Sequence, residues 1–185
     1  MHTNTSVLAV TLGLGLGLPQ IYGLVKPAAF GAAIRQFPRS LPWGYALMLL
    51  GTLWFVWNVK LENNGDFASF KPAMMVGFLA TGVAVCIFVT DFLAVRGLAI
   101  VFMCLGKLMV ETVRWLDTDW RLVITGWAYV LVIAGIWFTV SPWRLRDLLN
   151  WATTNDTRIR IGSFLRLAFG LFVALLGVTV FRTAP

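Results

Sequence analysis

The chain has 185 residues, 59% of them apolar and only 12% charged, about half the charged share of a soluble globular domain. With a mean hydropathy of +0.81, this balance excludes an ordinary water-soluble domain, and it excludes intrinsic disorder because disordered chains combine low hydrophobicity with high charge. We assign the net charge of +7 to loops that fix membrane topology and meet anionic lipid head groups, and not to nucleic-acid binding.

Six apolar runs are each long enough for a helix that crosses the hydrocarbon core, which takes about 20 residues. Helices are expected because lipid cannot satisfy backbone N–H and C=O groups. The sequence therefore predicts an all-α polytopic membrane protein, with a single transmembrane domain over residues 1–185. The six predicted spans are Ser6–Val25, Leu41–Val59, Pro72–Thr90, Gly97–Val113, Leu122–Val140 and Ile161–Phe181.

The first span carries a glycine-rich stretch from Gly13 to Gly17. A phosphate-binding loop would lie between a strand and a helix, whereas this stretch lies inside an apolar span. Gly13 and Gly17 are four residues apart on one helical face, a spacing typical of close helix packing in membranes. We expect them to pack against another span.

Two connections between spans are predicted to form short amphipathic helices in the membrane interface. Pro27 and Pro142 open these stretches, and proline is favoured at the first position of a helix. Apolar residues then recur at the spacing of one helical face, although ordinary connecting loops are the alternative. The predicted apolar faces are Phe30, Ala33, Ile34 and Phe37 in the first stretch, and Leu145, Leu148, Leu149 and Ala152 in the second.

The loop charges predict the topology. One side carries five basic residues: Lys60, Lys71, Arg114, Arg121 and Arg182. The other side carries eight: Lys26, Arg35, Arg39, Arg96, Arg144, Arg146, Arg158 and Arg160. The positive-inside rule places the second group in the cytoplasm, which puts both termini in the other compartment. We expect lipid head-group contacts from Arg35, Arg39, Arg144, Arg146, Arg158, Arg160 and the snorkelling Arg166.

The spans group into three possible hairpin repeats, over residues 6–59, 72–113 and 122–181. The stretches Val25–Val59 and Val140–Phe181 share an apolar span, a proline before an amphipathic basic stretch, and an arginine before a glycine-bearing span. In this pattern they resemble a family of short, two-span bacterial inner-membrane proteins of uncharacterised function. The resemblance implies a bacterial inner membrane and carries no activity.

The fourth span holds the most informative polar residues. Lys107 lies near the middle of Gly97–Val113, Glu111 follows one turn later, and Arg114 is predicted on the same face. An ammonium at the centre of a spanning helix costs roughly 2.5–3.5 kcal/mol, so we expect Lys107 to pair with Glu111 and to face protein or water. The pair would fix helix packing or dock a partner; a proton or ion relay is the alternative.

Few residues in the chain offer cofactor or metal chemistry. His2 is the only histidine, and Cys86 and Cys104 lie in different apolar runs, so we expect no metal or haem site. Bound phospholipid is compatible with the sequence, and quinone or carotenoid binding stays open.

Four tryptophans fit interfacial belts, at positions 43, 115, 120 and 143, and four more lie in the spans, at positions 54, 57, 127 and 137.

These residues are compatible with three functions. The expected one is a non-catalytic accessory subunit of a larger membrane complex, packed against partner subunits and phospholipid. The second is a small transporter or channel with Lys107 and Glu111 on the wall of a polar cavity. The third is a membrane enzyme acting on lipid, for which Asp117, Asp119 and Arg121 form the one acidic–basic cluster; a solvated turn is the simpler interpretation of that cluster.

Overall fold

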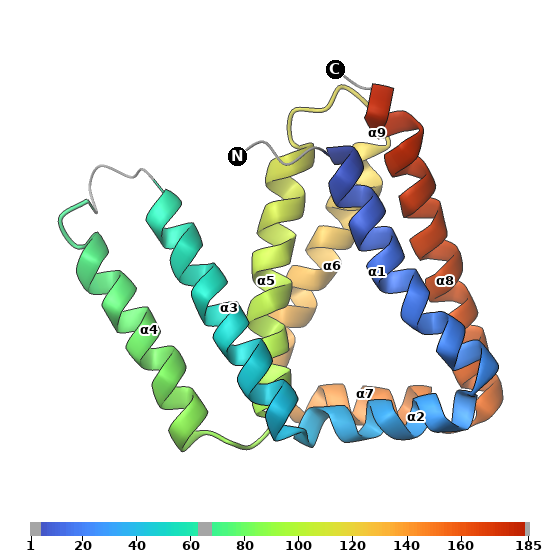
Figure 1. Cartoon of the computed structure of the whole chain (residues 1–185), viewed down its shortest axis with the longest axis horizontal. Helices are drawn as coiled ribbons and strands as arrows, with labels where there is room; N and C mark the ends of the chain where they lie inside the picture. Colours follow the sequence, from blue (N-terminus) through green and yellow to red (C-terminus); the bar gives the residue numbers. More distant parts are fainter. Residues whose placement is uncertain (1–4, 63–67, 184–185) are drawn as a thin grey trace. The chain divides into compact units, whose positions relative to one another are not determined.

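The computed structural model describes residues 5–62 and 68–183, which are helical and contain no strand (Figure 1). Ten-residue helices alternate with long ones in the first and last thirds of the chain. The helices are α1 (Thr5–Val25), α2 (Pro27–Gln36), the 3₁₀ turn η1 (Phe37–Arg39), α3 (Leu41–Leu61), α4 (Lys71–Phe88), α5 (Leu93–Val113), α6 (Arg121–Val140), α7 (Trp143–Ala152), α8 (Asp156–Val178) and α9 (Val180–Thr183).

Six of these helices are long and apolar enough to cross a membrane: α1, α3, α4, α5, α6, and α8 together with the start of α9. The prediction of an all-α polytopic membrane protein is confirmed, and so are the two short helices α2 and α7. Two spans begin four or more residues earlier than predicted. Helix α5 begins at Leu93, and α8 begins at Asp156, where five mostly polar residues extend the helix before its apolar part.

The chain contacts form two compact units. Unit 1 comprises Met1–Arg35, Leu105–Leu131 and Asp147–Pro185, and unit 2 comprises Gln36–Cys104 and Val132–Arg146. The boundaries fall within α2, α5, α6 and α7, so each of these helices contributes residues to both units.

In unit 1, α1 packs along α8 with the two backbones in close approach (Figure 1). A Cβ atom at Gly13 would lie 2.7 Å from the Ala174 nitrogen, and one at Gly17 would lie 3.4 Å from a methyl carbon of Leu167. The predicted packing role of both glycines is thus seen in the structure. Spans expected in the first and third hairpins therefore lie side by side.

The core of unit 1 brings four helices together. Thr5 at the start of α1 donates a hydrogen bond to the carbonyl of Thr112 near the end of α5, 3.3 Å away. Trp127 of α6 meets Phe169 of α8 edge to face, with ring centroids 5.3 Å apart. The buried apolar side chains of this core include Leu8, Ala9, Met109, Val113, Ile124, Ala128, Val173 and Leu176.

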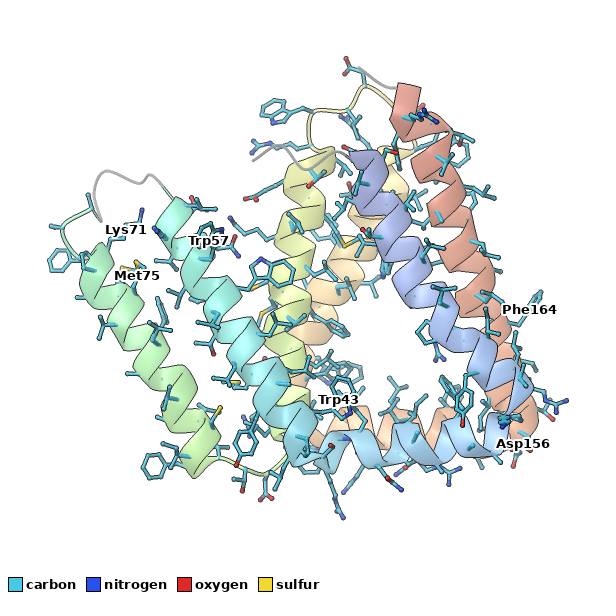
Figure 2. The ribbon with its side chains drawn as sticks, viewed as in Figure 1. Trp43, Trp57, Lys71, Met75, Asp156 and Phe164 are labelled. Carbon is cyan, nitrogen blue, oxygen red and sulfur yellow. The ribbon has the colours of Figure 1, made fainter. Side chains whose placement is uncertain are left out.

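In unit 2, α3 packs against α4 and the first half of α5. Phe55 and Phe78 stack edge to face across α3 and α4, 4.8 Å apart. A Cβ atom at Gly97 of α5 would lie 2.5 Å from the nitrogen of Met48 in α3, so this glycine permits close approach of the two backbones. Trp43 and Trp57 mark the start and the last turns of α3 in Figure 2.

The short helices α2 and α7 lie next to the end of α1 and the start of α8. Within unit 1, Arg35 of α2 donates a hydrogen bond of 2.8 Å to the carbonyl of Thr153, directly after α7. A Cβ atom at Gly31 would lie 2.8 Å from the Cδ1 atom of Ile159 in α8. Residues from α2, α7 and α8 therefore meet at one end of this unit, where Asp156 begins α8 (Figure 2).

Candidate functional site

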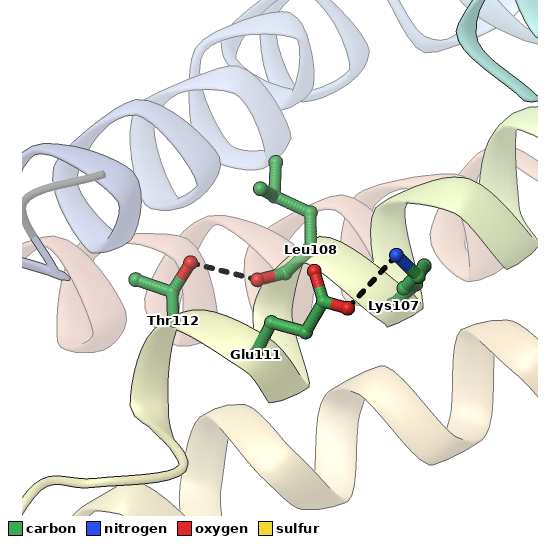
Figure 3. A network of polar contacts seen from close by, with 4 residues as sticks. All are labelled: Lys107, Leu108, Glu111 and Thr112. Carbon is green, nitrogen blue, oxygen red and sulfur yellow. Dashed lines mark hydrogen bonds and ion pairs between the residues drawn. The ribbon is translucent and has the colours of Figure 1, made fainter. Parts of the chain in front are cut away.

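An ion pair lies on the spanning helix α5. The Lys107 Nζ atom is 2.8 Å from a carboxylate oxygen of Glu111, one helical turn further on (Figure 3). The neighbouring Thr112 hydroxyl donates to the carbonyl of Leu108, 2.7 Å away. The geometry is that of an i, i+4 pair.

The pair faces away from the core of unit 1. Met109 and Val113 of α5 are fully buried in that core, and Lys107 and Glu111 each precede one of them by two positions. Two positions turn an α-helix by about 200°, so the charged face is nearly opposite the buried face. Consistently, the side chains keep 36% and 55% of their area exposed.

The depth of the pair differs from the prediction. Because α5 begins at Leu93 and ends at Val113, Lys107 lies six residues, about 9 Å, from the end of the helix and not at its middle. Arg114 follows the last helical residue, and its guanidinium carbon lies 4.9 Å from the centroid of the Trp115 ring. The predicted three-residue charged face therefore stops at Glu111, because the helix ends before Arg114.

A second feature is an apolar groove in unit 1, with a volume of about 330 Å³, where α2, α7 and α8 meet. Its walls include Phe30 and Ile34 of α2, Leu149 of α7, and Ile159 and Leu165 of α8. The sequence placed Phe30, Ile34 and Leu149 on the apolar faces of two separate helices. The fold joins those faces into one groove, which we call the α2–α7–α8 groove.

Two of the predicted head-group arginines line this groove. Arg158 lies in the first turn of α8, and its guanidinium carbon is 5.2 Å from the centroid of the Trp151 ring. One of its nitrogens also donates to the Trp151 carbonyl, 3.3 Å away. Arg166 folds back toward the start of α8: its Nη1 atom would lie 3.6 Å from a Cβ atom at Gly162. The Arg166 side chain thus points toward the N-terminal end of its helix.

The other predicted arginines have different surroundings. Arg35 is tied to Thr153, as described above, and Arg160 is exposed on α8 and is not among the residues that line the groove. In unit 2, Arg39 and Arg144 are exposed, and the Arg146 guanidinium carbon lies 5.9 Å from the centroid of the Phe92 ring.

Sequence reasoning did not single out Trp151 and Gly162. Trp151 is 63% exposed at the end of α7, and the Arg166 head group lies beside Gly162. The spacing of seven residues between Trp151 and Arg158 gives no signal by itself, because the chain turns between α7 and α8. Only the fold brings the two side chains together.

In residues 5–62 and 68–183, no three His, Cys, Asp or Glu side chains gather closely enough to hold a metal ion. His2 lies outside the described residues. The reduced thiols of Cys86 and Cys104 are both buried.

Comparison with family models, with curated proteins and with solved structures finds no match to this chain. The resemblance to short two-span bacterial proteins therefore stays a prediction.

Proposed function

We propose that the protein is a non-catalytic subunit of a larger integral membrane complex, in which a spanning helix of another subunit covers the Lys107–Glu111 face of α5. The observation that carries this proposal is the exposed ion pair on a helix long enough to span a membrane. Lipid at that face would contact two charged groups below the end of the helix. Placing charged groups in lipid is energetically unfavourable, and a partner that offers hydrogen-bonding groups at the same depth lowers this free-energy cost.

The outer surface of the spans is largely apolar. Large apolar side chains point outward along them, as Phe164 does on the outer side of α8 in Figure 2. Such a surface suits lipid or a protein partner equally. The charged pair breaks this apolar surface on α5, so it distinguishes one face as the contact site.

The test uses variants that remove both charges together, since a single charge left on an apolar spanning helix would carry a cost of its own. Lys107→Leu/Glu111→Leu is compared with Lys60→Leu/Glu62→Leu, which changes the same residue types at the end of α3. Each chain is extracted from its native membrane in a mild detergent, and the mass of the intact assembly is measured. We expect the wild type and the control to retain a second membrane protein in fixed stoichiometry.

The Lys107/Glu111 variant should lose that protein while its thermal unfolding midpoint stays within a few degrees of the wild type. A wild-type chain that runs as a monodisperse monomer, or only as copies of itself, would refute the proposal. Ion flux in liposomes that depends on Lys107 would refute it in favour of the transporter.

We also propose the location and orientation. The basic residues around α2, α7 and the start of α8 favour the cytoplasmic face of a bacterial inner membrane, with both termini on the opposite side. Phospholipid is the second proposed partner.

A further inference from the structure

The α2–α7–α8 groove combines an apolar wall with two cationic head groups, and it does not depend on the proposed partner subunit. Helices α2 and α7 are short, amphipathic, and lie next to the end of α1 and the start of α8. This is the position of the membrane surface for a bundle of this kind. A ligand at the groove would meet lipid chains on one side and water on the other.

The volume and lining favour an elongated apolar group. Ligand pockets have volumes of about 300–1,000 Å³, and this groove lies at the lower end of that range. Phe30, Ile34, Leu149, Ile159 and Leu165 offer hydrocarbon and ring surface from three helices. One acyl chain can lie along such a wall without burying a polar group.

The charges favour a phosphate at the mouth of the groove. Arg158 donates one hydrogen bond to the Trp151 carbonyl. A guanidinium has five N–H donors, so donors remain for a ligand. The Arg166 head group lies level with Gly162, one helical turn from Arg158, or about 6 Å along the axis. No acidic side chain stands among the residues that line the groove in the described chain. Two arginine forks match phosphate oxygens better than lysines would.

We infer that the α2–α7–α8 groove is a binding site for an anionic glycerophospholipid, with one acyl chain against the apolar wall and the phosphate between Arg158 and Arg166. Trp151 supports the site in two ways. Its ring faces the Arg158 guanidinium, which fixes the direction of that side chain, and a tryptophan at this level suits the head-group region. The Arg166 head group lies beside Gly162, 3.6 Å from where a Cβ atom would stand.

The experiment compares lipid retention by the full chain in neutral detergent, measured by native mass spectrometry with equal amounts of phosphatidylglycerol and phosphatidylcholine. We expect one phosphatidylglycerol to be retained in preference. Arg158→Gln and Arg166→Gln should each lower that retention about fivefold, the factor expected for one basic group at a membrane surface. Arg160→Gln is the matched control, because it removes the same charge from the same end of α8 outside the groove.

A second variant tests the position of the Arg166 head group. Gly162→Leu would fill the space beneath the Arg166 head group, so it should lower retention of phosphatidylglycerol while the net charge stays the same. The wild type alone gives an answer if this variant does not fold.

Equal retention of the two lipids by the wild type would overturn the inference. An equal loss in Arg160→Gln would also overturn it, because the effect would then be one of general charge. Displacement of the lipid by an equal concentration of glycerol phosphate would overturn it in favour of a water-soluble phosphate ligand. A wild-type chain that retains the lipid but no partner protein would refute the proposed function alone.

Discussion

Gly13 and Gly15 stand two residues apart in the same glycine-rich stretch of α1, and the structure gives them opposite surroundings. A Cβ atom at Gly13 would meet the backbone of Gly170 and Ala174 in α8, whereas one at Gly15 would meet nothing within 4 Å. The four-residue spacing predicted which glycines pack, since it selects one face of the helix. It did not identify α8 as the neighbour, because several spans offer small residues.

Gly13→Ala should therefore destabilise the protein, and Gly15→Ala should not. The Gly13 methyl group meets backbone atoms that cannot turn away, and such overpacking costs about 1–3 kcal/mol. Replacing Gly15 by alanine stabilises a helix in water by up to about 1 kcal/mol. The stabilisation is smaller in a membrane, because lipid already favours the helix. The measurement is thermal unfolding of both variants in the same detergent. Equal midpoints would contradict the α1–α8 contact.

The same contact contains a polar group that the sequence did not reveal. Ser163 of α8 is fully buried beside Gly23 of α1, and among the described residues its hydroxyl has no hydrogen-bond partner. Its position could be predicted only with the α1–α8 pairing already known. The small size of both residues explains why serine fits there.

At the scale of the element, the start of α5 depends on an unusual backbone conformation. Phe92 has a φ of 55°, in the left-handed region that a non-glycine residue rarely adopts. Its carbonyl accepts the amide hydrogens of Val95 and Arg96, at 2.9 and 3.1 Å, and its ring lies under the Arg146 guanidinium. The residue thus begins the helix earlier than the apolar pattern predicted.

Phe92→Gly and Phe92→Ala separate the two contributions of this residue. Both lose the ring, but alanine keeps the left-handed backbone cost of roughly 1–2 kcal/mol and glycine does not. We expect Phe92→Ala to unfold at lower denaturant concentration than Phe92→Gly. The free energy of unfolding should differ by about 1 kcal/mol, because the greater freedom of glycine in the unfolded chain offsets part of its advantage. The measurement is denaturant unfolding of both variants, and the reverse order would show that α5 does not need this conformation.

At the scale of the whole molecule, the sequence predicted the number and the approximate ends of the spans. Lipid imposes a length and an apolar composition on every spanning helix, and both are readable without knowing any contact. The α2–α7–α8 groove could not be predicted in this way. It exists because two short helices, more than a hundred residues apart in sequence, lie together beside the start of α8. The periodicity of apolar residues predicts the apolar face of each short helix, but it does not predict which helix packs against that face.

The proposed orientation can be tested on single-cysteine additions, because the native Cys86 and Cys104 are buried and should react slowly. Asp119→Cys lies between α5 and α6, and Thr154→Cys lies between α7 and α8; both positions are exposed and separated by one span. In spheroplasts, a membrane-impermeant maleimide should label Asp119→Cys, and it should label Thr154→Cys only after the membrane is opened. The opposite pattern would place α2 and α7 outside the cytoplasm.

The pairing of α1 with α8 has a consequence for biosynthesis. The glycine face of the first helix emerges from the ribosome about 160 residues before the Ala174 surface that covers it. At a translation rate of about 5–20 residues per second, α1 remains in the bilayer without α8 for roughly 10 to 30 s. During that delay the insertion machinery or another nascent helix has to cover the glycine face of α1. The packing of α1 against α8 can therefore form only when translation is nearly finished.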